Sequence, residues 1–303
     1  MKLFSLLTAS LLLGTSPAHA LNIVLSNDDG LTSNVKALYE HLKSQGHDVI
    51  VSVPCHGQSG MGAAIIFSEP LTPLTADCHN GAAKAGDPGA GRMTRDGMGA
   101  DFFYVRGTPV MALLYGLDVQ AIARWGKVPD LVLSGPNEGQ NVGSVVVGSG
   151  TVSNAQYGAI RDIPAIAFSA GVKTTDNIGL ANPDSRKVAS LAGQLVAHLA
   201  DKAAGERLLP PGVALNVNFP DDLDSPKWRM ARIGDYDTYT IGFAPGSPKI
   251  TVARNANPPT AEQMDNEAVV YKSAIAISVM QVSYDHRPDM AHRIGKYLGG
   301  LMN

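Results

Sequence analysis

The sequence predicts an α/β fold, in which a doubly wound, mostly parallel, Rossmann-like sheet carries a β-rich appendage at its carboxyl end. Short runs of branched apolar residues, typical of strands buried on both faces, alternate with segments of helical period. Strand, helix and strand follow one another from the start, which is the order of a parallel crossover unit. From Trp228 onward the helical period fades and short alternating runs replace it.

The first crossover unit lies at residues 22–54. Residues 22–26 (NIVLS) form an apolar run that ends at the turn signal of residues 27–30 (NDDG). Residues 34–45 then place apolar side chains on one helical face and end before Gly46, a natural helix C-cap. A second buried strand is expected at residues 48–54.

The alternation resumes after residue 100. Pro109 suits the first turn of a helix, and the strands between helices are again short and apolar. We expect strands at residues 101–105, 131–134, 165–169 and 214–218, and helices at 108–123, from about 151, and at 185–204.

Two segments depart from this pattern. Residues 80–99 are rich in Gly and Ala with little apolar content, so we expect a mobile surface loop there. Residues 226–303 contain alternating runs at 249–253 and 268–282, which predict a β-rich extension with a hairpin arm used in assembly. The main α/β domain is accordingly expected at residues 21–225.

The amino-terminal segment resembles a secretory signal peptide. Residues 1–20 carry one cation, Lys2, then an apolar run, and end in Ala18-His19-Ala20, the small residues that a signal peptidase reads. We therefore expect cleavage after Ala20 and an exported protein, periplasmic or secreted. The apolar run is too short to cross a bilayer, and no later segment is long enough, so no membrane association is expected.

Charge argues against nucleic acid as a partner. Removing residues 1–20 takes away one Lys and no acid, so the net charge moves from -3 to -4. Lys and Arg are scattered without a basic cluster, whereas a protein that binds a nucleic acid duplex normally has a strongly basic face.

The chain has two cysteines, Cys55 and Cys78. In an oxidising compartment a pair of cysteines more often forms a disulfide than stays reduced. Each precedes a histidine, so a Cys2His2 zinc site with His56 and His79 is the alternative. Because paired Cys-His dipeptides do not match the usual zinc-ligand spacings, the disulfide is favoured.

Polar side chains follow several predicted strands at their carboxyl ends, where parallel sheets bind ligands. Asp28 and Asp29 follow the first strand, Ser59 follows the second, and Asn137 follows a later one. Two carboxylates, a hydroxyl and an amide carbonyl form an all-oxygen set that suits one Mg²⁺, Mn²⁺ or Ca²⁺ ion.

Asp-Asp-Gly alone is more often a polar turn than a metal site, since Asp and Gly are favoured in turns for backbone reasons. The preceding strand shifts the balance. Two adjacent acids at the end of a buried strand repel each other, and a bound cation is the usual reason for both to be present.

Residues 147–152 (VGSGTV) predict a glycine-flanked turn that opens a helix. Its first N–H groups could bind an anion, with Ser149, Gly150 and Thr151 around a phosphate. An ordinary Ser or Thr helix cap is the alternative, and for this tripeptide alone it is the more common outcome.

These motifs together resemble the SurE family of metal-dependent nucleotidases and acid phosphatases. They occur in the family's order across residues 22–220: LSNDDG (25–30), SG (59–60), GTP (107–109), SGPNEGQNVG (134–143), SGTV (149–152) and LNVNFP (215–220). The resemblance implies a SurE-like fold and hydrolysis of small phosphomonoesters such as nucleoside monophosphates. It also implies one divalent ion per subunit and a homodimer or homotetramer.

Carried over residue by residue, the resemblance makes Asp28, Asp29, Ser59 and Asn137 metal ligands, with Asp28, Asp29 and Asn137 also catalytic. It places Asn137, Ser149, Gly150 and Thr151 around the substrate phosphate.

The chain also departs from the family pattern. Pro136 stands where the family commonly has Ile, residues 55–58 (CHGQ) replace a basic, Asn-containing stretch, and the carboxyl-terminal signature is faint in residues 266–281. These changes affect the residues expected to set substrate preference and subunit contacts.

Other functions remain open at this point. An exported protein could use the same oxygen ligands to bind a metal or a phosphorylated solute without turnover. A dinucleotide-dependent oxidoreductase is disfavoured because no G-x-G-x-x-G follows the first strand. A receiver-type aspartyl-phosphate domain is disfavoured because a D-x-D arrangement is lacking.

His56, three residues before Ser59, is a candidate general acid, although most histidines so placed have no catalytic role.

Overall fold

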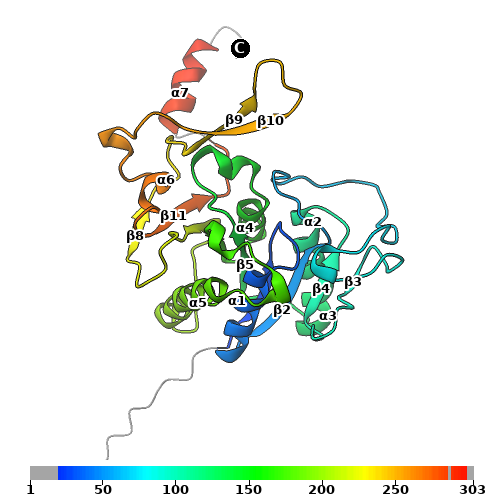
Figure 1. The fold of residues 1–303 in the computed structure, drawn as a ribbon. Coiled ribbons are helices and arrows are strands. Elements are labelled where there is room, and N and C mark those ends of the chain that lie inside the picture. The colour runs from blue at the N-terminus through cyan, green and yellow to red at the C-terminus, as the bar shows by residue number, and fades with distance from the viewer. Residues whose placement is uncertain (1–19, 286–287, 299–303) are drawn as a thin grey trace, which may run out of the picture.

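A mostly parallel sheet organises the chain, as seen in a computed structural model that describes residues 20–285 and 288–298. Within these residues nine strands form one sheet in the order β3-β4-β2-β1-β5-β6-β7-β11-β8 (Figure 1). Neighbouring strands are parallel from β4 to β7, and the antiparallel pairs β3–β4 and β7–β11 lie towards the two edges. The predicted doubly wound α/β fold is confirmed.

The elements follow the predicted order closely. The strands of the sheet are β1 (Asn22–Ser26), β2 (Asp48–Pro54), β3 (Ala90–Arg92), β4 (Phe102–Val105), β5 (Leu131–Glu138), β6 (Ala165–Ala170), β7 (Val213–Asn218), β8 (Trp228–Ala231) and β11 (Ile275–Gln281). The α-helices are α1 (Ser33–Ser44), α2 (Pro109–Leu114), α3 (Ile122–Trp125), α4 (Gly150–Ile160), α5 (Pro183–Ala203), α6 (Glu267–Val270) and α7 (Pro288–Tyr297). A π-helical segment, η2 (Tyr115–Ala121), joins α2 to α3, and short 3₁₀ turns include η1 (His79–Gly81) and η3 (Gly143–Gly148).

Helices cover both faces of the sheet, which explains why its central strands are mostly apolar. In β1, Ile23 and Leu25 pack into the core shared with α1 and α5. Val24 points to the other face, into the core shared with α2 and α4. A strand buried on both faces has no position where a polar side chain would meet water, so its sequence does not alternate.

The strand order reverses direction between β1 and β5. From β1 the chain first moves to β2 on one side, and it later returns to β5 on the other side. In open parallel sheets the crevice at the carboxyl ends of two such strands is the usual ligand site. The segments that follow β1 and end β5 carry Asp28, Asp29 and Asn137.

The segment at residues 80–99 is more ordered in its contacts than the predicted surface loop. It supplies β3, which pairs with β4 at the sheet edge. The hydroxyl of Tyr104 donates to the carbonyl of Pro88 at 2.7 Å, and Met93 is buried in the core. The sequence did not predict β3, because the strand has only three residues and the segment has little apolar content.

The carboxyl-terminal region is partly a continuation of the sheet. β11 pairs with β7 and β8 pairs with β11, so both belong to the main sheet beyond the predicted boundary at residue 225. Ile275, Ala276 and Met280 of β11 are buried, which ties this strand to the main core. The antiparallel hairpin of β9 (Tyr239–Phe243) and β10 (Ile250–Arg254) forms a separate sheet, and it projects from the body together with α7 (Figure 1).

Residues 1–19, which hold nearly all of the predicted signal peptide, lie outside the described residues. In the part of the chain that the structure describes, no helix has both the length and the apolar character needed to cross a membrane.

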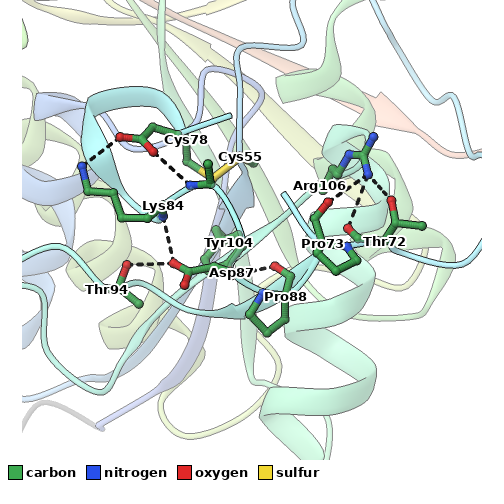
Figure 2. Close-up of a disulfide and its surroundings, with 12 residues drawn as sticks. Cys55, Thr72, Pro73, Cys78, Lys84, Asp87, Pro88, Thr94, Tyr104 and Arg106 are labelled. Atoms are coloured by element: carbon green, nitrogen blue, oxygen red, sulfur yellow. Dashed lines mark hydrogen bonds and ion pairs between the residues drawn. A yellow bond between two sulfur atoms is a disulfide. The ribbon is translucent and has the colours of Figure 1, made fainter. Parts of the chain in front are cut away.

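A disulfide joins Cys55, at the end of β2, to Cys78, just before η1. The two cysteines are 23 residues apart and both are buried, and the N–H of His79 donates to the carbonyl of Cys55 at 2.8 Å. Figure 2 shows the bond next to the segment that carries Lys84 and Asp87. The sulfurs are therefore not free to bind zinc, and no cluster of three or more His, Cys, Asp or Glu side chains suited to a metal occurs among residues 20–285 and 288–298.

Removing this disulfide should lower stability by restoring freedom to the unfolded chain. Closing a loop of 23 residues corresponds to about 3 kcal/mol of unfolding free energy. We expect the variant Cys55→Ala/Cys78→Ala to show that loss in denaturant titration, and a reducing agent to destabilise the parent protein but not the variant. Equal unfolding midpoints for the two proteins would contradict this role.

Candidate functional site

The turn after β1 is fixed by its own side chains. Asn27 donates from Nδ2 to the carbonyl of Gly30 at 2.7 Å, and the N–H of Gly30 donates back to Oδ1 at 3.1 Å. Gly30 has φ of 85°, which other residues rarely adopt, and a Cβ there would lie 3.0 Å from the carbonyl oxygen of Pro54. This closed turn sets where Asp28 and Asp29 project.

Asp28 lies against the first turn of α4. Its side chain accepts a hydrogen bond from the Thr151 hydroxyl, and only 3% of the residue is exposed. Burial raises the pKa of Asp28, while hydrogen bonds from Thr151 and from the backbone N–H groups of Thr151 and Gly150 oppose the rise. The helix N-terminus thus already binds an anionic group, the Asp28 carboxylate.

Asp29 faces β5. Its Oδ2 accepts a hydrogen bond from the backbone N–H of Glu138 at 3.0 Å. Burial, and then the neighbouring charge of Asp28, raises the pKa of Asp29 to about 7. In the described chain neither carboxylate forms an ion pair with Lys, Arg or His. A buried acid, Asp28, and a half-buried one, Asp29, are therefore adjacent, and no cationic side chain of the described residues pairs with either.

Asn137 lies within β5, not in a loop after it. The pairing of β5 with β6 shifts register between Ser134 and Asn137, and such irregularities redirect side chains near sites. The amide Nδ2 of Asn137 donates to the carbonyl of Gly139 at 2.7 Å, which leaves Oδ1 within 3.2 Å of the Thr151 hydroxyl. One hydroxyl therefore contacts both Asp28 and Asn137.

Ser59 is less closely associated with the other predicted ligands. It is exposed in the loop after β2, and the N–H of the preceding Gln58 donates to the backbone carbonyl of Asp28 at 2.7 Å. No hydrogen bond joins the Ser59 hydroxyl to Asp28, Asp29 or Asn137 among the bonds of the described residues. The structure thus groups three of the four predicted ligands and leaves Ser59 at the rim.

The tripeptide at residues 149–151 has a mixed role. Ser149 is the N-cap of α4, since its Oγ accepts from the N–H of Val152 at 3.1 Å, as the ordinary capping alternative supposed. Gly150 is needed sterically, because a Cβ there would lie 2.5 Å from Cγ of Pro109 and 2.7 Å from Cβ of Asp28. Contact of these residues with a phosphate stays a prediction.

The structure adds a role for Thr151, which was predicted only beside the phosphate, and one for Glu138, which was not predicted as a site residue. Thr151 acts through its hydroxyl, which bridges two acceptors, whereas the motif suggested only backbone donors. Glu138 supplies the N–H that holds Asp29, and its own half-buried carboxylate accepts from Asn177 Nδ2 at 2.7 Å. Burial raises the pKa of Glu138 as well. The one sign in the sequence that Glu138 belongs to the site was its position directly after Asn137.

His56 is exposed and has no hydrogen bond to the acidic pair in the described part of the chain. Its role as general acid remains untested. The grouped donors of Asp28, Asp29 and Asn137 are all oxygens, which fits a hard divalent cation better than a transition metal that prefers sulfur or imidazole.

Substituting Gly150 should disturb the acidic pair directly. The added methyl group of Gly150→Ala would overlap Pro109 and Asp28, so we expect a loss of about 1–3 kcal/mol in unfolding free energy. Gly99→Ala is the matched control, since no atom lies within 4 Å of its Cβ position. Equal denaturant midpoints for the two variants would show that the contact at Gly150 is not restrictive.

Comparisons with known proteins identify relatives over most of the α/β domain. An acid phosphatase of Yarrowia lipolytica is 34% identical over 205 residues, covering 65% of this chain and 56% of the relative. A 5'-nucleotidase SurE of Aquifex aeolicus is 35% identical over 200 residues, covering 65% and 64%, and one of Lawsonia intracellularis is 32% identical over 201 residues, covering 66% of each. The matches thus span 56–66% of the lengths of these relatives.

A solved structure agrees in fold. The crystal structure of SurE protein from Aquifex aeolicus superposes with a TM-score of 0.67 at 25% sequence identity, covering 93% of this chain and all of that one. The family model described as survival protein SurE matches residues 23–239, which is more than half of the chain. This match includes β1, β5 and the first turn of α4, and it shows that the chain belongs to the SurE family.

Proposed function

We propose that the chain is a metal-dependent phosphomonoesterase, a 5'/3'-nucleotidase or broad acid phosphatase that releases phosphate from nucleoside monophosphates. The observation that carries this proposal is the adjacent acids Asp28, buried, and Asp29, half-buried, at the switch point of the sheet, with which no cationic side chain of the described residues pairs. The relatives named acid phosphatase and 5'-nucleotidase SurE support the same reaction class.

Asp28, Asp29 and the amide oxygen of Asn137 would hold one Mg²⁺, Mn²⁺ or Ca²⁺ ion, with Ser59 reaching it from the rim. Such an ion, when bound, screens phosphate charge and activates water for attack. Thr151 positions two of the ligands, because its hydroxyl contacts both Asp28 and Asn137. Glu138 positions the third ligand through its backbone N–H.

We favour water over Asp28 as the nucleophile. The Asp28 carboxylate is almost fully buried and is engaged by Thr151, so it has little freedom to approach a phosphorus atom in line. The N-terminus of α4 supplies fixed positive potential at this corner, which would also favour the oxygens of a phosphate near Ser149, Gly150 and Thr151.

Export and self-association are part of the same proposal. The leader-like residues 1–20 and the Cys55–Cys78 disulfide are typical of a periplasmic or secreted protein. The hairpin of β9 and β10 aligns five exposed apolar side chains on one face, which a second copy in a homodimer or homotetramer would cover: Tyr239, Ile241, Phe243, Ile250 and Val252. An isolated two-stranded hairpin is marginal in water without such cover.

Asp28→Asn tests the site. The amide keeps the size of the side chain but removes a charge, so we expect weaker Mn²⁺ or Mg²⁺ binding by calorimetry and a loss of about 100-fold or more in kcat on nucleoside monophosphates. High metal concentration should restore part of the rate.

Asp118→Asn, which changes an exposed acid paired with Arg161, is the matched control and should keep both affinity and rate. An unchanged metal affinity with unrecoverable activity would instead identify Asp28 as a nucleophile. Near-normal hydrolysis by Asp28→Asn without added metal would reject the site.

The raised pKa of Asp29 predicts how pH controls metal binding. The pKa of Asp29 is raised from 3.8 to about 7 in the folded state. The contribution of this carboxyl group to the stability of the metal-free protein is therefore fully present below about pH 4, and it is lost as pH rises through 7. A cation that binds the ionised pair offsets that loss. The rise in Tm caused by Mg²⁺ or Mn²⁺ should therefore be larger at pH 8 than at pH 5, and near zero at both for Asp28→Asn. A metal effect that is independent of pH would contradict the assignment.

A further inference from the structure

A strap formed by residues 60–72 borders an open cavity of about 430 Å³ near the turn that carries the candidate site. The strap follows Ser59 and ends shortly before the disulfide at Cys78. Its other wall comes from residues 106–111, which run from the end of β4 into the first turn of α2. A volume of this size lies in the range of small-molecule sites.

The strap is fixed at its start, middle and end. The N–H of Gly62 donates to the carbonyl of Gly148 at 2.9 Å, and the Thr108 hydroxyl donates to the carbonyl of Ala64 at 2.6 Å. Arg106 donates to the hydroxyl and carbonyl of Thr72 and to the carbonyl of Pro73 (Figure 2). These contacts connect separate parts of the fold, so the cavity is a built feature.

The cavity adjoins the acidic pair. Gln58 lines it, and the N–H of Gln58 donates to the backbone carbonyl of Asp28 at 2.7 Å. Gly107 also lines it, and Pro109, two residues further on, lies against Gly150 at the start of α4. A substrate with its phosphate at Asp28 and Asp29 could therefore extend its leaving group into this space.

The walls combine apolar surface with polar groups. Ile66, Leu71 and Met111 supply apolar side chains. Arg106, His56 and Glu69 supply a guanidinium, an imidazole and a carboxylate. Arg106 forms no ion pair within the described residues, and its hydrogen bonds to neutral strap oxygens hold the guanidinium at the wall.

A nucleobase matches this combination. Its faces are apolar and polarisable, so they pack on aliphatic side chains and stack on a guanidinium, while its edges carry donors and acceptors for the polar groups. A sugar phosphate or glycerol phosphate has no such face and would leave the apolar wall in contact with water.

We propose that this cavity is the leaving-group site and holds the purine or pyrimidine base of a nucleoside monophosphate, with Ile66, Leu71 and Arg106 as specificity-determining residues. The inference rests on the proposed phosphomonoesterase function and adds the residues that select the substrate.

Kinetics on two substrates test the inference. For Ile66→Ala and Leu71→Ala we expect kcat/KM on adenosine 5'-monophosphate to fall about 10-fold, mainly through KM, and kcat/KM on glycerol 2-phosphate to change less than about twofold. Ile122→Ala is the matched control, because Ile122 is exposed to 47% on α3, close to the 45% of Ile66, and lies outside the cavity. Equal losses on both substrates, or no loss on either, would overturn the proposal.

Binding of adenosine, which has no phosphate, separates this inference from the proposed reaction. The variant Asp28→Asn should still bind adenosine in a calorimetric or NMR titration, and adding Ile66→Ala should weaken that binding about 10-fold. Adenosine binding that depends on Ile66, together with no hydrolysis of nucleoside monophosphates by the unsubstituted protein supplied with metal, would leave the base site standing and reject the proposed reaction. Turnover of adenosine 5'-monophosphate with adenosine binding unaffected by Ile66→Ala would reject the base site alone.

Discussion

The contact of the Asp28 carboxylate with the first turn of α4 holds the candidate site together. Through the Thr151 hydroxyl it connects the turn after β1 to Asn137 of β5, so one side chain joins three elements that are far apart in sequence. The contact is possible only because Gly150 has no side chain. The desolvation of two acids is unfavourable by itself, and the N–H groups of the helix offset only part of it. The site therefore has a negative charge that these groups do not balance, and it favours a bound cation.

The sequence predicted most of the sheet because burial on both faces leaves a strong pattern. The run at residues 22–26 has three consecutive branched apolar residues at its centre, and the turn after it needs Asn, Asp and Gly for reasons that act within four residues. Asp28, Asp29 and Asn137 could be grouped from sequence because strand ends in a parallel sheet converge. Such arguments use local chemistry and topology, which a single sequence carries.

What the sequence could not predict depends on contacts between distant segments. The bridging role of Thr151 needs the register shift in β5. Gly135 and Pro136 mark an irregularity at that place, but they do not indicate which side chain of α4 Asn137 will meet. Ser59 lies in the expected loop, yet the distance from a loop residue to a carboxylate depends on how the strap after it is anchored. β11 was expected in an appendage because its alternating run resembles any half-buried strand, and its place beside β7 depends on long-range pairing.

The carboxyl-terminal region is tied to the site by a buried polar network. Glu267 is fully buried and accepts hydrogen bonds from Ser278 of β11, Asn216 of β7 and the backbone N–H of Gly143. Gly143 begins the segment that leads into the first turn of α4, so a carboxylate in the tail helps to position the backbone that holds Asp28. Burial raises the pKa of Glu267 to about 7, which means that its ionised form is tolerated only because these three donors are present. The tail up to β11 is therefore part of the structure that shapes the site, whereas the hairpin of β9 and β10 forms a sheet of its own.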